Sequence, residues 1–555
     1  MKKVKFIVSI AVTFAAGIIL SGCVNCAAVK TQKKTDPARL QIGWGKRSIA
    51  MKGPAAITGQ SHLRVALGEY SPVYASALAI TNAKETAVFV SVDVVSVSAS
   101  VLKGMLDILK KEAPEIPGNK IIVNASHTHD GPSTANIVIK YPNKVEVIGG
   151  TKVQEFLARQ IADAVKEAWQ NRKDGSIAYG YGFATVGFSR RTLYLDDTSK
   201  RFGNQPGYAS NGHCIMYGNT KDDKFAGYEA GMDPFINIMY TFDADDKLSG
   251  AIVNVPCPAQ NMEAIWHYYA GFWANVREKM AAKYGDIGLI CQSAAAGDLA
   301  PRQLHYNEAE LRRYKLKYPE LVEDYKKNPI KFPYYIPREE KYLNKEILEI
   351  IRAEDAANRV MTAFDEVLSW ASKEKLTAPE FQHEVKTVKL DRFYLPPEIL
   401  AQEKEYNKKF MAQKFMTEGD KWQMLIHNST LNARRNKVNG VIKRFEEQQK
   451  TPALETDIHV VRIGDAAFAT NRFELFMDFM HRIQGRSPFT QTFIVQLVTD
   501  TKGVGSYLAT ERGEKNKGYG ATPYSCQVSP KGGQQLVEHT VEMLKNMKNI
   551  PAAQK

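Results

Sequence analysis

Val88-Phe-Val-Ser-Val-Asp-Val-Val-Ser96 and Lys120-Ile-Ile-Val-Asn124 are the two segments that decide the fold class of this chain. Both are rich in β-branched residues and have the length of a buried strand. The residues between them, Ser100 to Lys111, carry apolar side chains at helical spacing. A strand, a helix and a second strand in this order indicate an α/β domain, in which helices cover β-sheets.

The alternation of helices and strands continues towards the C-terminus. Lys152 to Gln170 predicts an amphipathic helix, because its apolar side chains recur mostly at three- and four-residue intervals. Strand-like runs return at Ile458 to Thr470 and at Thr492 to Leu497, and a closing helix is expected near Gln534 to Met547. We therefore predict an α/β fold with central β-sheets flanked by helices.

Residues 302–450 differ from the rest, with many charged side chains and with apolar side chains at helical spacing. We expect a large helical insertion here, within a single domain that spans residues 39–555. Two interpretations stay open. The insertion is either a solvated helical region that packs one apolar stripe on the domain, or a subdomain that gates access of a substrate.

The N-terminus predicts export of the chain. Three lysines precede the apolar run Phe6 to Leu20, which is shorter than the roughly 20 residues that cross a bilayer and is typical of a signal peptide. The tetrapeptide Leu20-Ser-Gly-Cys23 resembles a bacterial lipobox, in which the Cys is lipidated and becomes the mature N-terminus. We predict a lipoprotein signal peptide at 1–22, lipidation at Cys23 and a tether at 23–38. Ordinary signal cleavage near the same place is the alternative.

These signals predict a lipid-anchored protein of the bacterial cell envelope. Val24 follows the predicted lipidated Cys, where Asp is associated with retention in the inner membrane of some bacteria. We therefore expect the outer membrane, with attachment through the N-terminal lipid.

Composition excludes a disordered chain and disfavours nucleic acid as a partner. The chain has 555 residues, 44% of them hydrophobic, and 74 Lys and Arg against 60 Asp and Glu give a formal charge of +14. This charge is not gathered into a basic tract, and no nucleic-acid-binding motif appears. Of the six cysteines, five remain if Cys23 is lipidated, so at least one thiol stays free or binds something.

The first chemical signal is Asn124-Ala-Ser-His-Thr-His-Asp-Gly-Pro132, directly after a predicted strand. In extended backbone, residues i and i+2 project to the same side, so His127 and His129 can face one site. Spacing alone leaves two interpretations open: a metal site, or two partly exposed histidines in a turn.

Ser126-His-Thr-His-Asp-Gly-Pro132 resembles the Thr-His-Thr-His-Ser-Gly-Pro segment of the neutral, non-lysosomal ceramidase family. Further segments resemble the family in its order, namely Gly45-Lys-Arg-Ser-Ile49, Tyr74-Ala-Ser-Ala-Leu78, Gly297-Asp-Leu-Ala-Pro301 and Arg462-Ile-Gly-Asp465 with Glu474 after it. The resemblance runs from about residue 42 to the C-terminus and is weakest across the insertion. It implies the family's catalytic domain, and we expect no C-terminal immunoglobulin-like domain.

The family holds a catalytic Zn²⁺ with two His, a Glu and a Tyr. The resemblance implies His127, Glu474 and Tyr507 as three of these ligands, and it places Cys257 where the family has its second His. A thiolate is a good zinc ligand. The alternative is that Cys257 is buried or forms a disulfide with Cys291.

Other readings of the remaining residues also stay open. If Glu474 is not a metal ligand, it is a surface acid at the start of the helix Leu475 to Ile483. If Tyr507 is not a metal ligand, it is a buried aromatic residue with a hydrogen-bonded hydroxyl. Asp93, in the strand before the His pair, is a candidate to orient a ligand imidazole.

The catalytic set departs from the family at one position. The family serine of Gly-Asp-Val-Ser-Pro is Ala300 here, so a zinc-activated water is the expected nucleophile. Asp298 is a candidate to act as base or to orient the water, or else it caps a turn. His129 matches a substrate-contacting histidine. Arg190 matches an arginine that faces the active site, and Arg191 takes its role if the register is off by one.

These observations lead to three functional hypotheses. The first is a zinc-dependent hydrolase of amide or ester (N-acyl or O-acyl) bonds in a small-molecule substrate derived from a lipid or a glycan. The second is a non-catalytic, ligand-binding envelope lipoprotein on the same scaffold. The third is a binder of anionic polymers that uses the positive charge.

Overall fold

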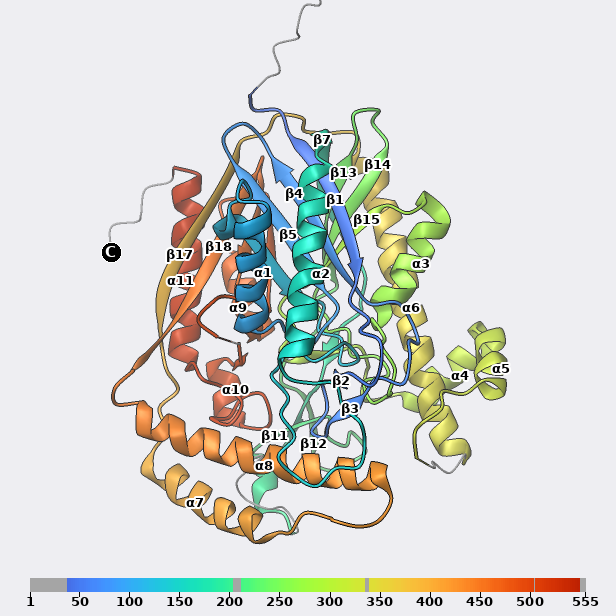
Figure 1. Ribbon diagram of the computed structural model, residues 1–555, viewed down its shortest axis with the longest axis vertical. Coiled ribbons are helices and arrows are strands. Elements are labelled where there is room, and N and C mark those ends of the chain that lie inside the picture. The colour runs from blue at the N-terminus through green and yellow to red at the C-terminus, as the bar shows by residue number, and fades with distance from the viewer. Residues whose placement is uncertain (1–36, 203–210, 335–338, 504, 550–555) are drawn as a thin grey trace, which may run out of the picture. The chain divides into compact units, whose positions relative to one another are not determined.

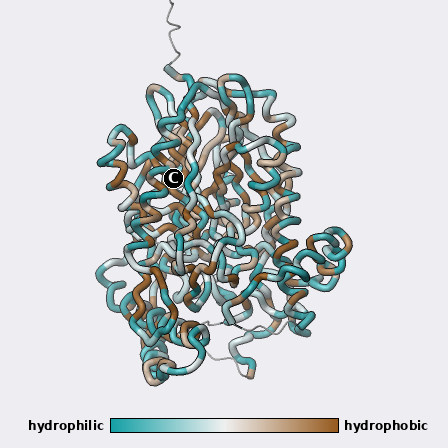
Figure 2. Tube along the Cα trace, turned by 45° about the vertical axis from the view of Figure 1, so that its right-hand side comes forward, coloured by the Kyte–Doolittle hydropathy of each residue, from teal (hydrophilic) through white to brown (hydrophobic). Residues whose placement is uncertain are grey.

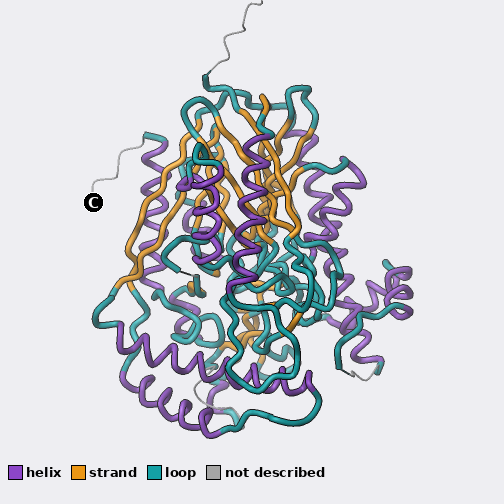
Figure 3. The backbone as a smooth tube through the Cα atoms, in the orientation of Figure 1, coloured by secondary structure: helices purple, strands orange, loops and turns teal. Residues whose placement is uncertain are grey.

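The computed structural model describes residues 37–202, 211–334, 339–503 and 505–549. Three β-sheets in it meet around a shared buried centre, and helices cover their outer faces (Figure 1, Figure 3). The predicted α/β fold with central sheets flanked by helices is therefore confirmed. The predicted signal peptide 1–22, Cys23 and most of the tether 23–38 lie outside the described residues.

The first sheet has the strand order β6-β5-β4-β1-β7, and α1 and α2 cover it. Its elements are β1 (Gln41–Ser48), β4 (Tyr74–Thr81), β5 (Thr86–Val92), α1 (Ala99–Glu112), β6 (Ile121–Ala125), α2 (Thr151–Gln170) and β7 (Lys173–Asp174). The helix α2 lies directly on β1, because a Cβ at Gly43 would come within 2.1 Å of the Ala168 carbonyl oxygen. Glycine is required at this close approach.

The second sheet has the order β15-β14-β13-β8, and α3 and α6 cover it. Its elements are β8 (Ser176–Phe183), β13 (Phe235–Phe242), β14 (Leu248–Val255), α3 (Phe272–Tyr284), β15 (Gly288–Ser293) and α6 (Glu340–Ala371). The third sheet has the order β17-β18-β19-β21, with α9 and α11 against it. Its elements are β17 (Phe381–Asp391), β18 (Ala453–Ile463), β19 (Ala466–Thr470), α9 (Met477–Gln484), β21 (Gln491–Val495) and α11 (Pro530–Met547).

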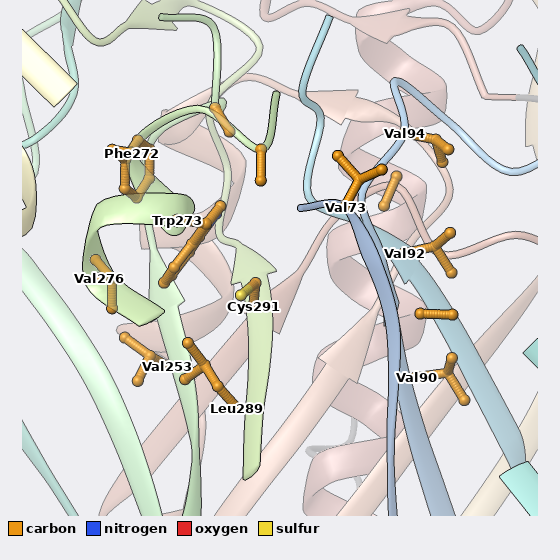
Figure 4. Packing of buried hydrophobic residues seen from close by; sticks show 14 of the residues in the cluster. Val73, Val90, Val92, Val94, Val253, Phe272, Trp273, Val276, Leu289 and Cys291 are labelled. Atoms are coloured by element: carbon orange, nitrogen blue, oxygen red, sulfur yellow. The ribbon is translucent and has the colours of Figure 1, made fainter. Parts of the chain in front are cut away.

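The strands are apolar on both faces, which explains the continuous hydrophobic runs in the sequence. In β5, Val88 and Val90 pack in the cluster that contains α1 and α2, whereas Phe89 points into the shared centre. Phe89 there meets Phe468 of the third sheet, with 4.9 Å between ring centroids. Figure 4 shows part of the first cluster, with Val90 and Val92 of β5 and with Phe272, Trp273 and Val276 of α3, and Figure 2 shows the hydropathy of each residue along the chain.

Two buried amides join the sheets where their strands end. Asn124 Nδ2 donates to the Cys291 carbonyl at 2.9 Å, which links the first sheet to the second. Asn254 Nδ2 donates to the Ile494 carbonyl at 2.9 Å, which links the second to the third. Because both bonds are buried, they fix the sheets relative to one another at this level.

Each sheet contains one parallel pair: β5 with β6, β14 with β15, and β19 with β21. The carboxyl ends of these strands lie close together, since Gln496 N donates to the Ser293 carbonyl at 3.1 Å and Thr499 N to the Val123 carbonyl at 2.9 Å. Ligands of α/β proteins bind outside such ends. The loops that leave them are therefore the place to look for a site.

The remaining elements are short strands and peripheral helices. They are β2 (Ala56–Ile57), β3 (Arg64–Val65), η1 (Gly118–Lys120), β9 (Phe188–Ser189), β10 (Arg191–Tyr194), η2 (Thr198–Lys200), β11 (Cys214–Met216), β12 (Phe225–Tyr228), β16 (Leu299–Ala300), α4 (Asn307–Lys317), α5 (Pro319–Lys327), α7 (Pro397–Ala412), α8 (Lys421–Glu447), β20 (Glu474–Leu475), β22 (Tyr507–Leu508) and α10 (Glu511–Asn516). None of the described helices has the length and apolar character needed to span a membrane.

The predicted helical insertion at 302–450 requires a correction. The strand β17 runs through it and pairs along its full length with β18, so it belongs to the third sheet. Two separate helical segments result, α4 to α6 and α7 to α8. The buried face of α6 also covers the second sheet, since a Cβ at Gly180 of β8 would meet Trp370 at 2.3 Å.

Candidate active site

His127 lies two residues beyond β6, in a left-handed backbone conformation with φ 62°. Its side chain is 3% exposed, so the alternative of a partly exposed turn histidine is wrong for this residue. Its Nδ1 lies 2.7 Å from the Val95 carbonyl oxygen. A carbonyl only accepts, so Nδ1 carries the proton and the Nε2 lone pair is free to bind a cation.

Glu474 and Tyr507 are neighbours because β20 and β22 pair in parallel, residue 474 with residue 507. Two glycines make room for this ribbon. A Cβ at Gly297 would lie 2.4 Å from the Glu474 carbonyl oxygen, and a Cβ at Gly505 would lie 1.6 Å from the Arg472 carbonyl oxygen. Gly297 belongs to the segment Gly297-Asp-Leu-Ala-Pro301, which resembles the ceramidase family.

The three side chains His127, Glu474 and Tyr507 converge. Glu474 Oε2 lies 3.4 Å from His127 Nε2. Burial opposes ionisation of Glu474, whereas the Arg190 guanidinium and the Tyr507 hydroxyl favour the carboxylate and act to lower its pKa. Burial raises the pKa of the Tyr507 phenol well above its usual range.

This arrangement fits a bound cation. With its proton on Nδ1, His127 presents a lone pair to an ionised carboxylate, and two acceptors at 3.4 Å repel unless a proton or a metal ion lies between them. Imidazole, carboxylate and phenolate are donors that Zn²⁺ accepts in general. Among the described residues, no group of three or more His, Cys, Asp or Glu side chains could hold a metal, so a third donor beside His127 and Glu474 would have to be of another type, and the Tyr507 phenol is the candidate.

Cys257 does not form a disulfide. Both Cys257 and Cys291 are buried free thiols, and the alternative of a bond between them is wrong. The Cys257 thiol donates to the Pro258 carbonyl at 3.4 Å, and burial raises its pKa well above the usual range. Within the described part of the chain it belongs to no three-residue His, Cys, Asp or Glu cluster. Its role as the fourth ligand stays a prediction.

Arg190, and not Arg191, faces the converging side chains. Its Nη2 donates to the Tyr507 hydroxyl at 3.0 Å and lies 3.7 Å from Glu474 Oε2. Its position is fixed by a second bond from Nη2 to the Gly297 carbonyl at 2.8 Å. Arg191 instead forms a buried ion pair with Glu229.

His129 lies in a chain of polar contacts that starts at Arg190. Arg190 Nη1 donates to Gln260 Oε1 at 3.2 Å, which leaves Gln260 Nε2 to donate to His129 Nε2 at 2.5 Å. The proton of His129 is then on Nδ1, 3.1 Å from Glu263 Oε2. Arg302 Nη2 lies 3.1 Å from the other oxygen of Glu263.

The protonation states of Glu263 and His129 are set by burial and by the charged groups beside them. Burial opposes ionisation of Glu263, but His129 and Arg302 outweigh it and lower the pKa of the carboxyl to about 2. Burial lowers the pKa of His129, although Glu263 acts in the opposite direction. A neutral histidine held between an amide and a carboxylate is the result.

Asp298 caps a helix. Its Oδ1 accepts from Met477 N, the first residue of α9, at 3.1 Å, and its own carbonyl accepts from Arg190 N at 3.1 Å. Burial raises the pKa of the carboxyl to about 6. The contacts found are those of a residue that holds α9 and the Arg190 segment in place.

Asp93 does not orient an imidazole, contrary to the expectation. Its carboxylate accepts from Arg277 Nη1 at 2.7 Å and from Tyr74 N at 2.8 Å, and the carbonyl of Val95 orients His127 instead. Ala300 is buried in the β16–β9 pair. Ser189 in β9 pairs with Leu299, and directly paired residues share a face of a sheet, so its hydroxyl does not take the position of the missing serine.

Sequence analysis missed Gln260, Glu263, Tyr217 and Arg302. Gln260 and Glu263 lie just after Cys257, and a carboxylate in the loop that carries an expected ligand is a usable signal. Tyr217 and Arg302 have no local pattern of their own. Arg302 stacks over the Tyr217 ring at 4.3 Å, so both belong to the site only through the fold.

Comparisons with known proteins find matches to neutral ceramidase in sequence and in fold. No family model matches the chain. A neutral ceramidase from Pseudomonas aeruginosa is 24% identical over 299 residues, which are 51% of this chain and 40% of the relative, so the match spans less than half of the relative's length. The crystal structure of neutral ceramidase from Pseudomonas aeruginosa matches with a TM-score of 0.60 and 15% identity over 94% of this chain and 76% of that chain. A ceramidase complexed with C2 matches with a TM-score of 0.57 and 14% identity over 93% and 76% of the two chains. This chain is therefore similar to neutral ceramidase in sequence over about half of its length, and in fold over most of it.

Proposed function

We propose that this chain is a metal-dependent hydrolase that cleaves an amide or ester bond with an activated water. The single observation that carries the proposal is the meeting of the His127 lone pair with the Glu474 carboxylate at 3.4 Å, beside the Tyr507 phenol. The relationship to neutral ceramidase supports a hydrolase. His127, Glu474 and Tyr507 would hold Zn²⁺, with Cys257 as the proposed fourth ligand.

When bound, zinc would lower the pKa of a water molecule and polarise a substrate carbonyl. The chain supplies the rest. The buried Arg190 guanidinium is oriented by Gly297 and Gln260, and it can stabilise negative charge that develops on a carbonyl oxygen. Because Ala300 has no hydroxyl, the chain itself offers no serine nucleophile at the family position.

His129 Nε2 accepts from Gln260, and Nδ1 lies 3.1 Å from Glu263 Oε2. In the proposal, a substrate displaces Gln260 from His129 Nε2, and the ring then contacts the substrate while Glu263 keeps the proton on Nδ1. Asp298 acts through the backbone of Arg190 and the first turn of α9. We also propose lipid attachment at Cys23 and location in the outer membrane, with a lipid- or glycan-derived substrate.

Element analysis and hydrolysis together test the proposal. We expect about one zinc per chain in the wild type, its loss in His127→Ala, and its retention in the matched control His305→Ala, whose ring lies beside Tyr228. The same proteins are assayed on a panel of N-acyl and O-acyl compounds that includes ceramide. Equal metal content in the wild type and His127→Ala contradicts the proposal.

The second candidate is a binding protein without catalysis, and the observation that favours it is Ala300 in place of the serine. In that case the protein binds members of the panel but releases no product, whether or not zinc is present. The variant Cys257→Ser tests the fourth ligand independently of whether the protein is a hydrolase or a binding protein. Its zinc affinity should fall only if the sulfur binds the metal.

A further inference from the structure

A cavity of about 520 Å³ lies beside the contact between Glu263 and His129. Glu263 and Arg302 form one side of it. The lining also contains Phe332 and Tyr334, and Tyr342 and Glu349 of α6. The volume is within the range of about 300–1,000 Å³ that is typical of small-molecule sites.

We propose that this cavity binds a neutral, polyhydroxylated ring such as a monosaccharide unit, and that this ring is the recognised part of the substrate. The inference rests on the proposed function, because it places a substrate group one side chain away from His129. Glu263 makes this link, with one oxygen 3.1 Å from His129 Nδ1 and the other 3.1 Å from Arg302 Nη2.

The lining fits a sugar ring better than an acyl chain. Three aromatic rings, of Phe332, Tyr334 and Tyr342, offer flat apolar surface to the C–H face of a pyranose. The carboxylates Glu263 and Glu349 offer acceptors to its hydroxyl edge. An acyl chain would remove these charged groups from water without replacing their hydrogen bonds, which is costly.

Arg302 and the carboxylates of the lining are already paired within the protein, which favours a neutral ligand, and Lys345, also in the lining, is the cation that the anionic probe below tests. Arg302 lies between Glu263 at 3.1 Å and Glu349 at 3.4 Å. Glu346, also in the lining, accepts from the Tyr325 hydroxyl at 2.6 Å. An anionic or cationic ligand would have to break these pairs, whereas hydroxyl groups can bind to their remaining lone pairs.

The aromatic residues of the lining are Phe332 and Tyr334, which follow α5, and Tyr342 in α6. They lie in the part of the chain where the resemblance to ceramidases is weakest. A change of substrate class within the family therefore has a structural location, outside the converging ligands.

Ligand-observed NMR titration of the full-length protein tests the proposal with three probes. They are methyl β-glucoside, which has no acyl group to hydrolyse, octanoate as a single acyl chain, and glucose 6-phosphate as an anion. The variants are Tyr342→Ala and the control Tyr394→Ala, which removes a tyrosine that is 58% exposed and outside the cavity lining.

We expect methyl β-glucoside to bind, and Tyr342→Ala to weaken its binding about 3- to 10-fold, as the loss of one stacked ring implies. Tyr394→Ala should leave it unchanged. Absence of glucoside binding, equal binding by both variants, or binding of octanoate that depends on Tyr342 overturns the inference. Stronger binding of glucose 6-phosphate than of the glucoside overturns the neutral class.

The outcome is separable from that of the proposed function. His127→Ala should keep glucoside binding while it loses zinc. Glucoside binding by a wild-type protein without zinc refutes the hydrolase proposal and leaves the cavity assignment standing. A zinc-containing protein that hydrolyses the acyl panel but does not bind the glucoside supports the hydrolase proposal and refutes the cavity assignment.

Discussion

The replacement Glu263→Gln tests the polar chain behind the candidate active site. The carboxylate of Glu263 has one oxygen 3.1 Å from His129 Nδ1 and the other 3.1 Å from Arg302 Nη2, and glutamine keeps its size while it removes the charge. The amide can present only one oxygen, so either His129 or Arg302 loses its acceptor.

The expected loss follows from the energy of such contacts. A hydrogen bond to a charged group contributes about 1.5–3 kcal/mol, which corresponds to roughly a 10- to 150-fold fall in kcat/KM if the bond is needed in the transition state. Carboxylates that support catalytic histidines give losses of about 10- to 100-fold in general. We therefore expect kcat/KM to fall about 10- to 100-fold.

The assay is steady-state hydrolysis of the best substrate from the acyl panel, with zinc content measured on the same samples. Zinc should stay at the wild-type level, because Glu263 does not touch His127, Glu474 or Tyr507 in any contact described above. The control Glu354→Gln removes a carboxylate that is paired with Lys279 at 2.5 Å and does not belong to the contacts of His129, Glu263 and Arg302. It should retain activity. If Glu263→Gln keeps more than a third of kcat/KM, or loses zinc in parallel with activity, the reasoning is refuted.

Three further predictions concern the scaffold. Gly505→Ala should lose zinc, because its Cβ would lie 1.6 Å from the Arg472 carbonyl oxygen and displace β20; element analysis that finds full zinc content contradicts this. Arg64→Met should destabilise the protein by about 3–5 kcal/mol in denaturant unfolding, because it leaves the fully buried Asp130 without its partner at 2.6 Å, and Asp130→Leu added to it should recover part of the loss. The raised pKa of Asp298 means that the folded state binds this proton more tightly, so its contribution to stability is present at low pH and is lost as pH rises from 3.8 to about 6. Asp298→Asn should make the unfolding midpoint less dependent on pH in this window, and an unchanged pH profile would show that the carboxyl does not titrate there.

Much of the fold could be predicted because the central strands are apolar on both faces. Continuous runs such as that of β5, at Thr86–Val92, remain visible in one sequence without an alignment. The strand β17 was missed although it alternates, since Phe381, His383 and Leu390 are buried among exposed neighbours. Its position between long helices caused it to be read as part of them.

The site was predictable only in part, for a physical reason. His127, Glu474 and Tyr507 sit in short segments that resemble a known family, so each could be named from sequence. Arg302 reaches the site by stacking on Tyr217 and pairing with Glu263. The residues next to it in the sequence do not predict these contacts. Asp93 was assigned to the wrong partner because a place in the strand that precedes the His pair does not fix the direction in which its side chain points.

The meeting of three strand ends has a consequence for how the protein matures. The first donor of the proposed metal site follows β6 near the start of the chain, and the last lies in β22 near its end. A growing polypeptide therefore holds no complete set of the proposed donors. Under the proposed function, metal binding would follow completion of the fold, and a bound ion would report that the molecule has reached its native state.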